Sequence, residues 1–279
     1  MKNCAFTQET APTLYVEVTG VRFAYRSFGA SSKVPLIFFQ HFIGNIDDWD
    51  PAITNEIAKS RKVILFNNTG VASTSGETPD SVAQMAKDAI SFINALNITT
   101  ADILGYSLGG FIGQQIAINA PGLIRKMILV GTAPRGSVSS FLDFFNKMKM
   151  YEGAERFLFT FFSSTDNSRS KGMASLKRIY APGNRRDSIV SNETMQAQAH
   201  AIHSWGTMKP SVIINDIRQP TLIINGSNDE MLLTINSYKL FQEIQGSLLF
   251  LYPHSAHGAL FQYPDMFVEH CNYFLDKDL

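Results

Sequence analysis

Short runs of apolar residues recur along the chain without the polar alternation of a strand that has one wet face. Continuous runs of this kind are typical of strands buried on both faces of a parallel sheet. They lie at residues 34–39, 62–66, 101–105, 127–130, 221–224 and 248–252. Ahead of them, two β-rich runs at 14–18 and 21–25 flank Gly20 and predict a hairpin. About eight strands are therefore expected.

Apolar residues at helical spacing separate several of these runs. Residues 80–96 form the clearest case, and we expect Asp80 to cap that helix. Residues 110–118 predict another helix directly after the run at 101–105. Buried strands that alternate with helices predict an α/β fold with a mostly parallel sheet wound on both faces.

Residues 136–210 interrupt this alternation with a helical segment rich in Phe and Met. Its members include Phe141, Phe144, Phe145, Met148, Met150, Phe157, Phe159, Phe161, Phe162 and Met173. We expect an inserted helical cap at 136–210, between core segments 1–135 and 211–279. Its apolar underside would roof an active site, since Met and aromatic side chains suit an adaptable apolar pocket. The alternative is a helical excursion with an ordinary core.

Composition narrows the class of function. The chain has 279 residues and zero formal net charge, and charged residues make up 17% of it. No basic surface for a nucleic acid or an anionic membrane is expected, and no apolar stretch approaches the ~20 residues of a membrane span. The first residues lack the apolar region of a signal peptide.

Cysteine usage points to a reducing compartment. Cys4 and Cys271 are too few for a disulfide framework, and no Cys/His cluster suggests a metal site. We expect two reduced thiols in a cytoplasmic protein that needs no metal or cofactor. The expected partner is a small apolar substrate, and the sequence leaves the oligomeric state open.

The most specific motif is Gly105-Tyr106-Ser107-Leu108-Gly109, between a predicted strand and a predicted helix. This G-x-S-x-G pattern is the nucleophile elbow, a strained turn that exposes a serine hydroxyl. Both flanking glycines are needed because larger side chains would collide with the strand and the helix. The Leu108 N–H then lies at a helix N-terminus, where it could receive an oxyanion.

With this motif and the order of its strands, the chain resembles the α/β-hydrolase fold superfamily. The resemblance implies an acid after the penultimate strand, where Asp229 fits the G-x-x-D spacing from Gly226 and Glu230 lies one residue too far. It also implies a histidine after the last strand. His257 fits, with Pro264 seven residues on, whereas His254 lies too close to the strand. A neutral imidazole can deprotonate the serine, and the carboxylate orients the imidazole.

The same resemblance places a second oxyanion donor in the loop after residues 34–39. The family usually has His-Gly there, and this chain has His41-Phe42. The Phe42 N–H can still serve, with its ring at the mouth of the pocket. For His41 we expect a structural role, in which the ring binds loop backbone.

A second departure concerns the loop after residues 62–66. Asn67, Thr69 and Ala72 replace the Asp, Arg and second Gly that many relatives carry there, in a loop that braces the sheet edge. Apart from this departure, the general pattern of the chain, with its acidic stretch at 47–50, is similar to cofactor-free haloperoxidase-like serine esterases.

The serine at the elbow excludes haloalkane dehalogenases and epoxide hydrolases, which use an aspartate there. The prediction is a serine hydrolase of small to medium apolar carboxylic esters, acting through an acyl-enzyme on Ser107. The alternatives are a C–C bond hydrolase or a perhydrolase on the same triad. A slow-turnover small-molecule receptor is the alternative from another class, because fold alone does not fix chemistry.

Overall fold

A computed structural model describes residues 6–138, 141–181, 186–209 and 212–277. Cys4 lies outside them, and Cys271 is buried and unpaired. One eight-stranded sheet with the order β1-β2-β4-β3-β5-β6-β7-β8 forms the centre. β1 and β2 are antiparallel to their neighbours and all later pairs are parallel. The strands are β1 (Leu14–Val18), β2 (Val21–Gly29), β3 (Leu36–Phe39), β4 (Lys62–Phe66), β5 (Ala101–Tyr106), β6 (Ile124–Val130), β7 (Thr221–Gly226) and β8 (Leu248–Tyr252).

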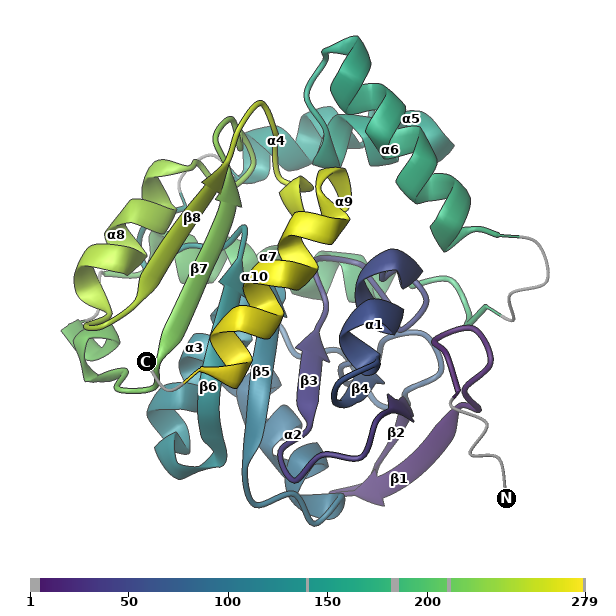
Figure 1. Cartoon of the computed structure of the whole chain (residues 1–279), viewed down its shortest axis with the longest axis vertical. Coiled ribbons are helices and arrows are strands. Elements are labelled where there is room, and N and C mark those ends of the chain that lie inside the picture. The colour runs from purple at the N-terminus through teal and green to yellow at the C-terminus, as the bar shows by residue number, and fades with distance from the viewer. Residues whose placement is uncertain (1–5, 139–140, 182–185, 210–211, 278–279) are drawn as a thin grey trace.

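Helices cover both faces of this sheet, with α1 and α10 in front of it and α2 and α3 behind it in Figure 1. The helices are α1 (Pro51–Ala58), α2 (Val82–Ala95), α3 (Leu108–Asn119), α4 (Phe141–Met148), α5 (Gly153–Phe161), α6 (Asp166–Ile179), α7 (Asn192–Thr207), α8 (Ile235–Glu243), α9 (Ala259–Gln262) and α10 (Pro264–Asp276). Short 3₁₀ turns span Pro121–Leu123 and Val212–Asp216. The predicted α/β fold and its sheet of eight mostly parallel strands are confirmed.

The central strands are buried on both faces because each face carries its own apolar cluster. In β3, Ile37 and Phe39 join the cluster on the α2–α3 side, whereas Leu36 and Phe38 join the cluster on the α1–α10 side. Successive side chains of a strand point to opposite faces, so a run without polar residues is what two covered faces require.

Two predicted boundaries were wrong. Helix α2 begins after Ser81, whose hydroxyl accepts the Gln84 N–H at 3.4 Å, and Asp80 is exposed one residue earlier. Strand β2 continues past residue 25 to Gly29 because it pairs with the whole of β4. The apolar pattern does not record such backbone pairing.

Within the described residues between β6 and β7 there are four α-helices, α4 to α7, as the helical character of residues 136–210 predicted. Residues 139–140, 182–185 and 210 of that segment lie outside the described part, and its boundaries as a cap stay a prediction. The rings of Phe141, Phe145 and Phe161 are buried, but Met150 is 80% and Met173 49% exposed. The Phe and Met residues therefore do not form one apolar underside.

Aspartates that follow β3 hold the segment around α6 against the core. The Asp50 carboxylate, fully buried, accepts hydrogen bonds from Arg178 at 2.6 Å and from the Ser175 hydroxyl at 2.7 Å. Asp48 pairs with Arg186 at 2.6 Å. Since charge-assisted pairs that are partly buried are screened little by water, these contacts fix the insertion on the core.

Helix α3 approaches the sheet most closely at Gly109. A Cβ at this position would lie 2.1 Å from the Phe39 carbonyl oxygen of β3, and backbone cannot move aside as a flexible side chain can. One turn later, a Cβ at Gly113 would meet only side chains at 3.5 Å or more, which is ordinary contact.

We expect Gly109→Ala to lower the free energy of unfolding by about 2 kcal/mol or more, because the helix must shift away from β3. The matched change Gly113→Ala should stay within about 1 kcal/mol of the wild type, on the stabilising side, since alanine is the better helix former. Urea denaturation of both variants measures the difference. Equal effects would contradict the packing described for Gly109.

Candidate active site

Ser107 occupies the turn between β5 and α3 in a backbone conformation that is unusual for a residue with a side chain. Its φ is 55° and its ψ is −116°. A Cβ on Gly105 would lie 2.5 Å from the Gly109 carbonyl oxygen, so both flanking positions must be glycine here. The Ser107 N–H donates to the Val130 carbonyl at 2.8 Å. Such strain is held only by surrounding structure and is common at functional sites.

Asp229 and His257, predicted in the loops that follow β7 and β8, are in direct contact. His257 Nδ1 and Asp229 Oδ2 are 2.7 Å apart. The other oxygen, Oδ1, accepts the backbone N–H groups of Met231 at 2.9 Å and Leu232 at 3.0 Å. Both side chains are almost fully buried, so this carboxylate is fixed by three hydrogen bonds away from solvent.

The contact decides the tautomer of His257. A carboxylate that accepts three hydrogen bonds makes Nδ1 the protonated nitrogen, and Nε2 then carries a lone pair. Nε2 is buried and has no hydrogen-bond partner among the described residues, so none joins it to the Ser107 hydroxyl. Catalytic hydrogen bonds are often long before substrate binds and tighten afterwards.

Tyr106 links the elbow to the histidine loop. Its ring stacks on the His257 ring with centroids 5.2 Å apart, and its hydroxyl donates to the His257 carbonyl at 3.0 Å. Burial raises the pKa of Tyr106, so the phenol stays protonated and remains a donor. The residue next to Ser107 therefore holds both the ring and the backbone of His257.

The two alternative residues of the same loops lie outside this cluster. Glu230 and His254 are both exposed. The acid turn and the histidine loop are joined by their backbones, since the Ser227 N–H donates to Tyr252 and the Asn228 N–H to Ser255, each at 2.9 Å. These bonds fix the spacing at which only Asp229 reaches His257.

Most backbone N–H groups of the loop after β3 are hydrogen-bonded. The N–H groups of His41, Ile43, Gly44 and Asn45 donate to Gln40, Gln198, His41 and Asp48, respectively. No acceptor for the Phe42 N–H is found among the described residues, and the same holds for Leu108 at the start of α3. The two predicted oxyanion donors are thus unengaged in the described part of the chain.

The side chains of His41 and Phe42 have different surroundings, and the place of the Phe42 ring at the mouth of a pocket stays a prediction. The His41 ring donates from Nδ1 to the Phe42 carbonyl at 2.8 Å, which confirms its predicted structural role. The Phe42 ring is buried and packs edge-on against Phe141 and Phe145 of α4, with centroids 5.7 and 5.5 Å apart.

Two residues of the insertion reach this cluster: Phe161, which the sequence offered only as one of many phenylalanines of the segment, and Gln198, which sequence reasoning missed. Phe161 stacks on the His257 ring at 6.0 Å, and its carbonyl accepts the Gly258 N–H at 2.6 Å. Gln198 of α7 accepts the Ile43 N–H at 2.7 Å. Nothing in the sequence separates Phe161 from the other phenylalanines. Gln198, however, is a polar residue on a helix face that also carries Ile202 and Trp205, and that position could have drawn attention.

The altered loop after β4 is held by side-chain hydrogen bonds of its substituted residues. Asn67 accepts the Ile46 N–H at 2.8 Å and donates to Asp187 at 2.7 Å. Thr69 donates to Asp88 of α2 at 2.8 Å. These bonds connect the loop to both the core and the insertion.

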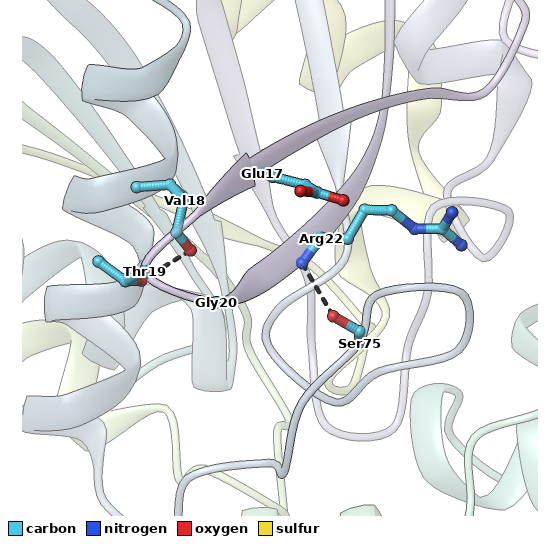
Figure 2. A pocket seen from close by; sticks show the side chains of 6 residues that line it. All are labelled: Glu17, Val18, Thr19, Gly20, Arg22 and Ser75. Carbon is cyan, nitrogen blue, oxygen red and sulfur yellow. Dashed lines mark hydrogen bonds between the residues drawn. The ribbon is translucent and has the colours of Figure 1, made fainter.

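A surface cavity of about 500 Å³ lies elsewhere, at the turn of the β1–β2 hairpin (Figure 2). It is lined by Glu17, Val18, Thr19, Gly20, Arg22 and Ser75, and none of these belongs to the cluster around His257. In the part of the chain that the structure describes, no cluster of His, Cys, Asp and Glu is arranged to hold a metal ion. The described helices include none with the length and apolar character needed to cross a membrane.

Known proteins share this architecture. A sequence model of the family described as "alpha/beta hydrolase fold" matches residues 34–264. The "Alpha/beta hydrolase fold protein from Chitinophaga pinensis" is 49% identical, with a TM-score of 0.96 over 98% of this chain and 100% of that chain. Because these matches span most of the chain, they show membership of a family and not only a shared fold.

Two curated relatives are more distant. "Putative carbamate hydrolase RutD" of Rhizobium rhizogenes is 24% identical over 78% of this chain and 84% of its own length. "Putative non-heme bromoperoxidase BpoC" of Mycobacterium tuberculosis is 29% identical over 46% of this chain and 47% of its own length. The second agrees with the resemblance to haloperoxidase-like enzymes. The chain belongs to the α/β-hydrolase fold family, and its relatives include hydrolases.

Proposed function

We propose that the chain is a serine hydrolase of small to medium apolar carboxylic esters, with Ser107 as nucleophile, His257 as base and Asp229 as the orienting acid. The observation that carries this proposal is the buried His257, whose Nδ1 is bound to Asp229 at 2.7 Å and whose Nε2 has no partner among the described residues. A buried nitrogen base without a hydrogen-bond partner costs folding free energy, so its presence calls for a functional explanation. Proton transfer is the usual function of such a group.

The reaction follows from these roles. Nε2 of His257 removes the hydroxyl proton as Ser107 Oγ bonds to the ester carbonyl carbon. The same proton passes to the leaving alcohol as the C–O bond breaks and the acyl-enzyme forms. A water molecule then repeats the sequence, which releases the carboxylic acid and restores Ser107.

The negative charge that develops on the carbonyl oxygen needs donors that are not engaged elsewhere. Phe42 N–H and Leu108 N–H meet that condition within the described residues. Leu108 is also the first residue of α3, where the helix dipole favours an anion. Both donors belong to the backbone, so they are placed by the fold and cost little to reorganise.

The choice of an apolar substrate rests on the rings around the site. Phe161 stacks on His257, and Phe42 packs with Phe141 and Phe145. Such a surface favours uncharged acyl and alcohol groups. Because one relative is named as a carbamate hydrolase, carbamates belong in the substrate panel beside esters.

His41 does not compete with His257 as the base. Burial lowers the pKa of His41 to about 4, and its hydrogen bond to the Phe42 carbonyl only partly offsets that effect. Its ring is also enclosed by those of Tyr106 and Phe161. His41 thus remains neutral at ordinary pH and keeps its Nδ1 proton on the loop backbone.

Turnover of p-nitrophenyl esters of graded acyl length, with a p-nitrophenyl carbamate alongside, tests the proposal. We expect repeated turnover in the wild type and a loss of at least about 10⁴-fold in Ser107→Ala, because the nucleophile is removed. Mass spectrometry after treatment with an organophosphonate should show one adduct, on Ser107. Near-normal hydrolysis by Ser107→Ala would disprove the mechanism, and one slow cycle per molecule would favour the receptor.

The neighbouring acids provide a matched pair. Asp229→Asn should lower kcat by about 10³- to 10⁴-fold, because the amide cannot hold His257 in the required tautomer. Glu230→Gln changes an exposed residue by the same single group and should leave kcat near the wild-type value. Steady-state kinetics of the two variants decide between them. A similar loss in both would mean that the wrong carboxylate has been chosen.

His41 should make stability depend on pH in one direction. In the unfolded chain histidine takes up its proton near pH 6.5, whereas the folded protein binds that proton only near pH 4. The unfolded state therefore binds more protons between these values, and acid lowers the free energy of unfolding by up to about 3 kcal/mol.

His41→Asn, which keeps a donor near the Nδ1 position, should remove this part of the pH dependence. Urea unfolding at several pH values between 4.5 and 7 measures it. His200→Gln, at an exposed histidine, serves as the control and should retain the wild-type slope. An unchanged slope in His41→Asn would show that His41 does not titrate as described.

A further inference from the structure

Helix α7 crosses the carboxyl-terminal edge of the sheet and touches several loops in the order of their strands. The Thr194 hydroxyl donates to the Gly70 carbonyl after β4, at 2.8 Å. Gln198 accepts the Ile43 N–H after β3, at 2.7 Å. The Trp205 ring NH donates to the Ala133 carbonyl after β6, at 3.3 Å.

The spacing of these contacts fits the sheet. Positions 194, 198 and 205 lie on one face of the helix, and at about 1.5 Å per residue the first and last are roughly 16 Å apart. The strands run β4, β3, β5, β6, and three spacings of about 4.8 Å make roughly 14 Å. Trp205 also stacks on Phe111 of α3 with centroids 5.3 Å apart. Helix α7 is thus anchored to the core at the site.

Gln198 is the contact that reaches the loop of Phe42. Its side chain is 1% exposed, and it binds Ile43, whose φ of 56° is rare for a β-branched residue. The opposite end of the same peptide unit, the Phe42 carbonyl, accepts the His41 ring at 2.8 Å. The Phe42–Ile43 peptide is therefore held at both ends, by one side chain of its own loop and one of α7.

We infer that Gln198 is a positioning residue for the oxyanion site. It holds the Phe42–Ile43 peptide in its strained conformation, so that the preceding Phe42 N–H stays free and correctly directed. This inference rests on the proposed function of Ser107 and of the Phe42 N–H. It assigns to the inserted segment a part in transition-state stabilisation in addition to covering the site.

The test replaces the acceptor while keeping the volume. Gln198→Met should lower kcat for p-nitrophenyl acetate by about 10- to 100-fold, less than the loss when a donor is removed outright, with KM little changed. Affinity for phenylboronic acid, whose serine adduct carries an oxygen at the oxyanion position, should fall by a similar factor. Gln198→Asn retains the amide but is one methylene too short, and it should show the same pattern.

Thr194→Val is the matched control, since it removes a hydroxyl on the same face of α7 that binds a different loop. It should lower the melting temperature at least as much as the Gln198 variants while leaving kcat and boronic acid affinity near wild type. If the wild type turns over, the proposed function stands. The inference would then be overturned by Gln198 variants that raise KM alone, or that lose no more kcat than Thr194→Val. Absence of wild-type turnover would overturn both.

Discussion

The close contact between α3 and the ends of β3 and β5 is the constraint on which the other parts of the site depend. Ser107 can turn the chain at φ 55° only because Gly105 and Gly109 leave room for each other and for the Phe39 carbonyl. The turn starts α3 against the sheet and leaves the Leu108 N–H at its first position. A side chain at either glycine would displace the helix, and with it the serine and that donor together.

Around this turn, polar groups are held by short hydrogen bonds within an apolar surrounding. Asp229 is fixed by two backbone N–H groups and by His257, and His257 is held in turn by the ring and hydroxyl of Tyr106. Burial strengthens each of these bonds and raises the penalty for an unpaired group. Nε2 of His257, which has no hydrogen-bond partner among the described residues, is the position where this penalty is greatest near the Asp229 contact.

The inserted helices make direct contacts with the residues around Ser107 and His257. Phe161 stacks on the His257 ring, and its carbonyl accepts the Gly258 N–H. Gln198 accepts the Ile43 N–H, and Asp50 of the core accepts hydrogen bonds from Arg178 of α6. A segment that merely roofed a pocket would need none of these polar contacts. The distribution of charge pairs and hydrogen bonds instead makes the insertion and the core one packed unit at this edge of the sheet.

The sequence by itself determined the fold class, the succession of strands and helices along the chain, and Ser107, Asp229 and His257 as candidates. Those features are local: buried strands leave unbroken apolar runs, and an elbow needs glycines at fixed offsets from its serine. Tertiary structure alone decided that Met150 and Met173 face solvent, that Ser81 caps α2, and that Phe161 and Gln198 reach the site. Gln198 and Ile43 are 155 positions apart, and nothing near either residue records the other. Contacts of that kind depend on how helices and loops are packed together, which one sequence does not display.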